Sequence, residues 1–212
     1  MKIDVYADVV CPWCYVGEKR LEKVLRERPD LEVERRWRPF QLRPEMPAGG
    51  VPWRPFALEK FGGEEGMRRA FAHVAAAGEP DGARFDFDRV ASAPNTVDAH
   101  RLILHAAERG REWPMVDRLF RGYFAGGLDL NDPDHLATMA ADAGLGADEA
   151  RASLAGDSGT RGVWESQRTA AEIGIGGVPF YVIDGRYAVS GGQPAEVWLR
   201  TLDAVEAERR VS

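Results

Sequence analysis

Cys11 and Cys14 are the only cysteines among the 212 residues, and they lie three positions apart in the stretch CPWC. Two thiols at this spacing can supply half of a zinc site, form a structural cross-link, or act as a redox pair. Pro12 suits the first position of a helix, so Cys11 is expected at the N-cap and Cys14 one turn further on. The amides and dipole of a helix N-terminus favour an anion, which populates the nucleophilic thiolate.

A zinc site is the weaker of these interpretations. Zinc takes four ligands, of which one pair of cysteines supplies two. His100 and His105 have the spacing of a zinc finger, but they lie far downstream of Cys14. On a helix, residues five apart point away from each other, because each residue turns by about 100°. We therefore expect no metal.

Composition and charge exclude several classes of partner. With 28 basic and 34 acidic residues the net charge is -6, and no Lys/Arg-rich run indicates nucleic-acid binding. No run approaches the ~18 apolar residues of a membrane helix, and Asp4 and Asp8 interrupt the first apolar stretch, so no signal peptide is expected. A cytoplasmic location is expected, where a disulfide is more often catalytic or sensing than structural.

The elements that must position the cysteines begin with a strand–helix–strand unit. Residues 2–10 alternate apolar and polar side chains, which indicates a strand, and a helical stretch follows from Pro12 until Pro29 ends it. Residues 31–42 alternate again. Strand, helix and strand in succession form a βαβ unit, so the two strands are predicted to be parallel.

From about residue 52 to residue 173 the pattern changes to helices separated by glycine and proline. Asn95 is predicted to cap one of these helices, and Asp132, followed by Pro133, another. Strand patterns then return in residues 180–183 and 187–189.

Asp184-Gly185 separates these two apolar runs, which is a strong hairpin signal. The final helix is predicted to place one apolar face on the sheet, made of Val197, Trp198, Leu202 and Val205. Neither end of the chain makes a sheet of ordinary size alone. We therefore predict one α/β domain from residues 1–45 and 175–212, with an all-helical insertion at 46–174.

Pro179 heads an apolar strand in the stretch GGVPFYVIDG and allows two interpretations. It can simply start an edge strand. Alternatively, Val178–Pro179 forms a cis-proline loop, because X–Pro is the place where a cis bond costs little. Such a loop would bring a backbone edge alongside the cysteines.

Taken together, these stretches resemble the DsbA family of thioredoxin-fold oxidoreductases, and in particular its FrnE-like cytoplasmic branch. The resemblance covers nearly the whole chain and rests on CPWCY, RPFQLRP, NTVDAHRL and GVPFYVIDGRYAVSGGQP. It implies a thioredoxin fold (βαβ…ββα) with the insertion described above.

By this resemblance Cys11 is the attacking cysteine and Cys14 the resolving cysteine. Val178 and Pro179, with Pro12 and Trp13 between the cysteines, are implied to bind substrate. Trp13 is expected to be exposed there and to form an apolar rim. Because Trp13 stands where periplasmic DsbA enzymes have a histidine, the thiolate lacks that charge-assisted bond, and a mild, reversible couple is expected.

Asn95, Thr96, His100 and Arg101 also match a segment of 2-hydroxychromene-2-carboxylate isomerases and kappa-class glutathione transferases, which act with glutathione. Those relatives carry a serine where this chain has its cysteine, so their mechanism does not transfer directly. The simpler interpretation of Asn95 is a plain helix cap, and that of His100 an ordinary interior or surface residue.

Two further groups have mainly structural interpretations. Asp8 could accept or relay the proton of Cys14, although a solvated charge near the helix N-terminus is the simpler reading. Five tryptophans are expected to be packing residues, because tryptophan is highly buried on average: Trp37, Trp53, Trp113, Trp164 and Trp198.

The sequence thus predicts an enzyme, a thiol–disulfide oxidoreductase that reduces, oxidises or isomerises disulfides through a mixed disulfide. Its partners would be a disulfide-containing protein or a small thiol, with glutathione or the thioredoxin system as redox partner. No bound cofactor is expected. The alternatives are a glutathione-linked small-molecule isomerase or transferase, and an interaction module that kept the fold but lost the chemistry. Substrate, direction and oligomeric state stay open.

Overall fold

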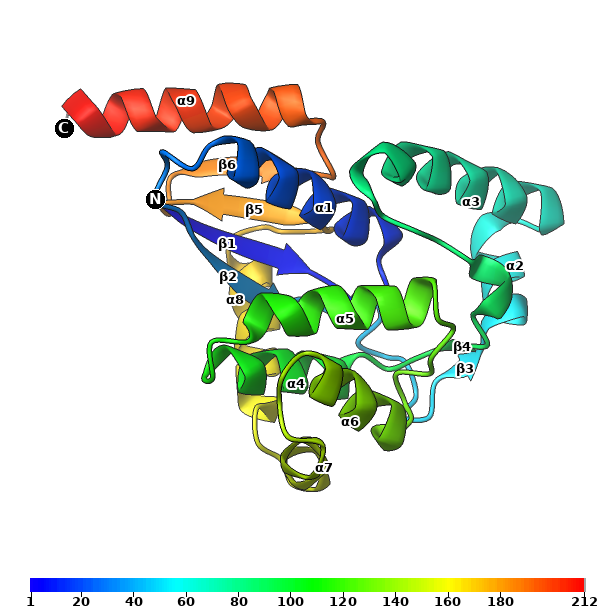
Figure 1. The fold of residues 1–212 in the computed structure, drawn as a ribbon. Helices are drawn as coiled ribbons and strands as arrows, with labels where there is room; N and C mark the ends of the chain where they lie inside the picture. Colours follow the sequence, from blue (N-terminus) through cyan, green and yellow to red (C-terminus); the bar gives the residue numbers. More distant parts are fainter. Residues whose placement is uncertain (212) are drawn as a thin grey trace.

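A four-stranded mixed sheet lies at the centre of the computed structural model, which describes residues 1–211 (Figure 1). Its strand order is β2-β1-β5-β6. The parallel neighbours are β1 (Lys2–Ala7) and β2 (Glu34–Pro39). β5 (Phe180–Ile183) runs antiparallel to both β1 and β6 (Tyr187–Ser190). Two strands come from each end of the chain, which confirms the predicted thioredoxin arrangement.

Helices cover both faces of this sheet (Figure 1). α1 (Pro12–Glu27) and α9 (Ala195–Val211) pack together on one face. There the Trp198 ring meets the ring of Tyr181 edge-on, with 4.7 Å between centroids. On the other face, Ala170 near the end of α8 (Thr160–Glu172) packs in a second, smaller apolar cluster. Helix α8 thus supports the sheet, although it lies within the range 46–174 assigned to the insertion.

The β5–β6 hairpin turns where it is predicted to turn. Asp184 and Gly185 have φ angles of 49° and 67°. Both are left-handed values, which Asp-Gly accommodates well, and the Arg186 amide donates to the Ile183 carbonyl at 3.0 Å to close the turn; Ile183 pairs with Tyr187, so the loop has three residues.

The remaining helices form the insertion between β2 and α8 (Figure 1). They are α2 (Trp53–Phe61), α3 (Glu64–Gly78), α4 (Val97–Ala107), α5 (Glu112–Phe124), α6 (Pro133–Asp142) and α7 (Ala147–Ala155). The prediction that the insertion is all-helical is wrong in one detail. β3 (Val51–Pro52) and β4 (Ser92–Ala93) form a small antiparallel pair, too short to show an alternating pattern.

The predicted helix caps differ in how they are built. The Asp132 side chain accepts from the amides of Asp134 and His135, as a capping residue does. Helix α4 begins one residue later than predicted, with Thr96 at the N-cap. Asn95 still contributes, because its Oδ1 accepts from the Val97 amide at 3.0 Å.

One apolar core continues from the sheet into the insertion. The Tyr15 ring of α1 stacks on Phe120 of α5 at 5.0 Å, and Trp37 of β2 meets the same ring edge-on. Trp37 and Trp198 are buried as predicted. Trp164 is 48% exposed, so that prediction is wrong. Its neighbour Val163 faces the core instead, because successive helical residues point about 100° apart.

Within residues 1–211, no helix combines the length and apolarity needed to cross a membrane.

Candidate active site

Cys11 caps the N-terminus of α1 through its backbone. Its φ and ψ are −90° and 112°, and its carbonyl accepts from the amides of Cys14 and Tyr15 at 3.0 and 3.2 Å. Its own amide donates to the Asp8 carbonyl at 3.0 Å. The Cys11 side chain thus projects from the first turn, as predicted, and makes no capping bond of its own. Both thiols are reduced and buried, with Cys11 5% and Cys14 2% exposed.

The Val178–Pro179 loop lies directly against this helix start. The peptide bond between the two residues is cis, and the Val178 carbonyl oxygen lies 3.7 Å from Cys11 Sγ. The two residues are 167 positions apart in the chain. The structure therefore brings the predicted substrate loop and the predicted nucleophile together.

Gly17 makes this close approach possible. A Cβ at this position would lie 2.4 Å from Tyr181 Oη and 3.3 Å from Pro179 Cγ. Any larger side chain would push α1 away from the loop and from β5. The glycine that follows CPWCYV therefore belongs to the architecture of the site.

Cys14 holds its proton tightly. Burial raises the pKa of its thiol well above the ordinary value, and the hydrogen bond with Cys11 adds to this effect. The negative charge of Asp8 raises the pKa further, whereas a hydrogen bond with the Asp8 backbone opposes the shift. Cys14 therefore needs a nearby base before it can act as a nucleophile.

Asp8 is a buried carboxylate, so its interpretation as a solvated surface charge is wrong. Only 1% of the residue is exposed, because it follows β1 into the centre of the molecule. Its Oδ2 accepts from the Leu42 amide at 2.8 Å. Its Oδ1 faces His100 Nε2 of α4 at 3.4 Å.

His100 is fully buried and forms a second layer behind Asp8. The Trp37 indole N–H donates to His100 Nδ1 at 3.1 Å. Because Nδ1 accepts this bond, Nε2 carries the ring N–H; it lies 3.4 Å from Asp8 Oδ1, but the two atoms do not form a hydrogen bond. His100 does not line the pocket beside Cys11, and it reaches the site only through Asp8.

Asn95 and Arg101 serve the fold rather than the site. Asn95 Nδ2 donates to the Met46 carbonyl at 2.7 Å, and its Oδ1 caps α4. Arg101 donates to the backbone carbonyls of Ser153 and Ser158 at 2.8 and 2.7 Å. Neither lines the pocket beside Cys11, whereas their neighbour Thr96 does.

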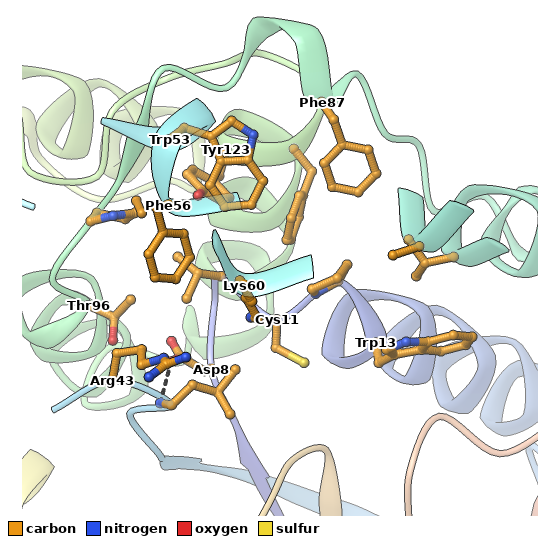
Figure 2. A pocket seen from close by; sticks show the side chains of 18 of the residues that line it. Asp8, Cys11, Trp13, Arg43, Trp53, Phe56, Lys60, Phe87, Thr96 and Tyr123 are labelled. Carbon is orange, nitrogen blue, oxygen red and sulfur yellow. Dashed lines mark hydrogen bonds between the residues drawn. The ribbon is translucent and has the colours of Figure 1, made fainter. Parts of the chain in front are cut away.

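A pocket of about 230 Å³ opens beside Cys11 (Figure 2), and neither Val178 nor Pro179 is part of its described lining. Pro12 and Trp13 line it, as predicted for the segment between the cysteines. Trp13 is half-buried rather than exposed, because its ring lies against His73 of α3 at 5.4 Å. Most of the remaining wall is apolar and aromatic and comes from the insertion, including Trp53, Phe56, Phe71, Phe87 and Tyr123.

Two cationic side chains, Arg43 and Lys60, also line this pocket, and the sequence analysis did not anticipate them. Lys60 lies in the last turn of α2, close to Cys11 (Figure 2). Partial desolvation lowers the pKa of Lys60 and nearby Arg43 acts in the same direction, whereas a negative charge on Cys11 opposes the shift. One signal could have revealed this wall: Trp53, Phe56 and Lys60 follow i, i+3, i+7 spacing on one helix face.

The chemistry of this arrangement is that of paired thiols. A sulfur at a helix N-terminus shares a hydrogen bond with a second thiol, and a buried carboxylate stands beside them. Within the described part of the chain, no group of three or more His, Cys, Asp or Glu side chains could hold a metal ion.

Comparison with known proteins agrees with this geometry. Residues 2–203 match the sequence profile of the DSBA-like thioredoxin domain. The uncharacterized protein YwbO of Bacillus subtilis is 26% identical over 205 residues, which are 94% of either chain. A probable DsbA oxidoreductase from Streptomyces coelicolor superposes with a TM-score of 0.88 at 36% identity, covering 98% of this chain and 91% of its own.

More distant structures share the fold. The cytosolic disulfide reductase DsbM from Pseudomonas aeruginosa, solved with GSH, is 20% identical with a TM-score of 0.67, over 98% of this chain and 100% of its own. A 2-hydroxychromene-2-carboxylate isomerase is 16% identical with a TM-score of 0.71, over 98% and 95%. With the domain match across residues 2–203, the chain belongs to the DsbA-like thioredoxin-domain family.

Proposed function

We propose that this protein is a thiol–disulfide oxidoreductase in which Cys11 attacks and Cys14 resolves. The observation that carries the proposal is the position of Cys11. Its sulfur stands at the N-terminus of α1, shares a hydrogen bond with Cys14 and lies 3.7 Å from the Val178 carbonyl. This supports the proposal, because two thiols and the backbone of the cis-proline loop lie within one small volume.

The reaction proceeds by two exchanges. The Cys11 thiolate attacks one sulfur of a substrate disulfide, so the substrate S–S bond breaks and its other sulfur leaves as a thiolate. Cys14 then loses its proton and attacks Cys11 Sγ, which expels the second substrate thiolate. The substrate gains two electrons, and Cys11 and Cys14 end as a disulfide. The reverse sequence oxidises a dithiol, and rearrangement of the mixed disulfide isomerises one.

Asp8 accepts the Cys14 proton in this scheme. Its carboxylate is buried next to Cys14, where it stays in place without solvent around it. The Leu42 amide donates to Oδ2 and orients the carboxylate, and the His100 ring packs beside it with Nε2 3.4 Å from Oδ1. His100 is thus a positioning residue, held in turn by Trp37.

The Val178 backbone holds the substrate. An extended segment can pair with an exposed backbone edge through main-chain hydrogen bonds, which depend little on side chains. This favours a protein disulfide as substrate, with the activity reversed or renewed by glutathione or the thioredoxin system. The cytosolic reductase DsbM solved with GSH supports glutathione as partner and the cytoplasm as location.

A glutathione-linked isomerase or transferase is the second candidate. One observation favours it: the enclosed aromatic pocket beside Cys11 suits a small molecule better than an extended chain. The structural likeness to 2-hydroxychromene-2-carboxylate isomerase points the same way.

Trapping of mixed disulfides distinguishes the two candidates. In Cys14→Ser the second exchange is blocked, so covalent adducts on Cys11 should accumulate in cell extract and appear on non-reducing gels. Cys11→Ser is the matched control and should trap almost nothing. Protein adducts support the oxidoreductase, whereas adducts of glutathione alone favour the second candidate. Equal trapping by both variants contradicts the assigned roles.

A further inference from the structure

The pocket beside Cys11 is built for more than an extended backbone. We propose that it binds a compact aromatic carboxylate that carries a thiol or disulfide sulfur, and that Arg43 and Lys60 recognise the carboxylate. This inference rests on the proposed function and names a substrate class for the same site. It is argued from the rings, the charges and the size of the pocket.

Three aromatic rings in the pocket wall are stacked on one another. Trp53 stacks on Phe71 with 5.8 Å between centroids and 10° between planes, and Phe71 stacks on Phe87 at 4.0 Å and 15°. All three line the pocket. Trp53 comes from α2, Phe71 from α3 and Phe87 from a short helical turn at Phe87–Arg89. Aromatic rings pack well against other flat rings in offset or edge-on contact. The wall therefore favours an aryl body over an aliphatic or peptide one.

The charges at the pocket are unbalanced. Arg43 and Lys60 both line it, and Asp8 is the only acidic residue in its described lining. Asp8 is already bound by the Leu42 amide and faces His100. Two cations therefore remain for an incoming anion.

Neither cation has a strong partner within the protein. Among residues 1–211, no carboxylate lies within ion-pair distance of Lys60, whose ammonium lies 5.7 and 5.5 Å from the rings of Phe56 and Phe61. Arg43 has an exposed contact with Glu45 at 3.4 Å, a kind of pair that contributes little, and its guanidinium lies 5.8 Å from the centroid of the Phe56 ring. A ligand carboxylate would supply the missing charge at both groups. Charge complementarity thus indicates a negatively charged ligand, and the rings indicate an aromatic one.

The size of the pocket limits the ligand to a compact one. Its volume of about 230 Å³ is below the ~300–1,000 Å³ of sites for drug-sized molecules. One substituted ring with a carboxylate suits this space, and Cys11 lies in the wall within reach of its sulfur.

The chemistry is the first exchange of the proposed function. Cys11 thiolate attacks the sulfur joined to the ring, the ligand's S–S bond breaks, and the second aryl group leaves as a thiolate. Cys14 then displaces the bound aryl thiolate and forms the Cys11–Cys14 disulfide. Two molecules of a small thiol such as glutathione reduce that disulfide and end as their own disulfide, so electrons and sulfurs balance.

Rates with three probe disulfides test the proposal on the reduced full-length protein. Dithiodibenzoate supplies ring and charge, its bis-carboxamide supplies the ring alone, and dithiodipropionate supplies the charge alone. Each rate is divided by the rate of mercaptoethanol with the same probe, which removes differences in intrinsic reactivity. We expect about a tenfold normalised preference for dithiodibenzoate over either other probe at low salt. The preference over the carboxamide should fall as salt screens the charges.

Charge variants assign that preference to its residues. Lys60→Ala combined with Arg43→Ala should bring the carboxylate-to-carboxamide ratio close to one. Lys23→Ala is the matched control, because Lys23 lies on α1 against Asp81 and does not line the pocket. It should keep the wild-type ratio.

Three outcomes would overturn the inference. A wild-type carboxylate-to-carboxamide rate ratio near one at low salt would show that the carboxylate is not recognised. Equal normalised rates for dithiodipropionate and dithiodibenzoate would show that the ring is not recognised. If the double variant slows both aryl probes equally, Arg43 and Lys60 act on the Cys11 thiolate and not on the ligand. A protein that reacts with every probe no faster than mercaptoethanol fails the proposed function itself, and the inference with it.

Discussion

The two sides of Cys11 are built in different ways. On the scaffold side, backbone groups face the sulfur: the first turn of α1 and the Val178 carbonyl at 3.7 Å. On the pocket side, side chains face it: aromatic rings and Lys60 from the insertion, with Arg43 from the segment after β2.

This difference separates reactivity from selection. A helix N-terminus and a backbone edge act on any disulfide, because neither depends on the identity of the substrate's side chains. Rings and cations select by shape and charge. Under the proposed function, the scaffold side would make Cys11 reactive and the pocket side would select the substrate.

Loss of the buried carboxylate should have the largest effect on the scaffold side. Asp8→Asn removes the base for Cys14, whose pKa burial has raised. We expect the second exchange to slow by about 100-fold, the lower end of the range for general-base catalysis, while the attack by Cys11 changes much less. Stopped-flow release of the second thiolate from a preformed mixed disulfide measures the affected step.

Asp4→Asn is the matched control for this change. Asp4 lies on β1, the strand that Asp8 follows, but pairs with Arg38 in a partly exposed position. Its loss should therefore leave the second exchange unchanged. An unaltered second exchange in Asp8→Asn would show that Cys14 loses its proton by another route.

The contact between α1 and the Val178 loop should tolerate no extra atom. In Gly17→Ala the new Cβ would meet Tyr181 Oη at 2.4 Å, so we expect a loss of about 1–3 kcal/mol in the free energy of unfolding. Urea unfolding measures it. Gly176→Ala, close to the same loop, meets nothing within 4 Å and should be close to neutral. Equal stability of the two variants would mean that the contact is not tight in solution.

The boundary between scaffold and insertion should respond to pH through Glu18. This α1 carboxyl accepts a hydrogen bond from Arg35, whose guanidinium lies 4.0 Å from the centroid of the Trp113 ring in the insertion. Arg35 favours the charged form, but within the described chain Glu18 Oε2 has no hydrogen-bond partner. Burial therefore dominates and raises the pKa of Glu18 from 4.5 to about 7.

The direction in which stability changes with pH follows from which state binds the Glu18 proton. Between pH 4.5 and about 7 the folded state binds the proton of Glu18 and the unfolded state releases it. Stability is therefore highest below this window and falls as the pH rises through it, by about 1–3 kcal/mol. In urea unfolding from pH 4.5 to 8, Glu18→Gln should flatten this decline. A steeper decline in the variant would mean that the Arg35 pair lowers the pKa of Glu18 instead.

The same two sides explain how far the sequence predicts the molecule. The sheet, the cap at Cys11 and the Asp184-Gly185 hairpin follow from local signals: alternation, a proline after the cap, and residues that adopt positive φ. For Pro179 the local sequence allows two interpretations, the start of an edge strand or a cis bond. The resemblance to a known family favours the cis bond.

The surroundings of the cysteines depend instead on contacts between segments far apart in the chain. Asp8 looks like a surface charge in sequence, and only the packing of α4 against β2 buries it beside His100. Arg43 and Lys60 belong to different elements and meet at the pocket through tertiary packing. Local sequence patterns carry no information on such tertiary contacts. The burial of Asp8 and the positions of Arg43 and Lys60 at the pocket therefore do not follow from them.

A redox titration of Cys11 and Cys14 tests the central claim most directly. The full-length protein is equilibrated in glutathione buffers of increasing oxidised fraction, its free thiols are alkylated, and its mass gives the state of the pair. The account predicts one reversible two-electron transition in which the Cys11–Cys14 disulfide forms and both thiols are lost together. It would be contradicted by a pair that stays reduced across the series, or by a stable glutathione adduct on Cys11 with Cys14 still free.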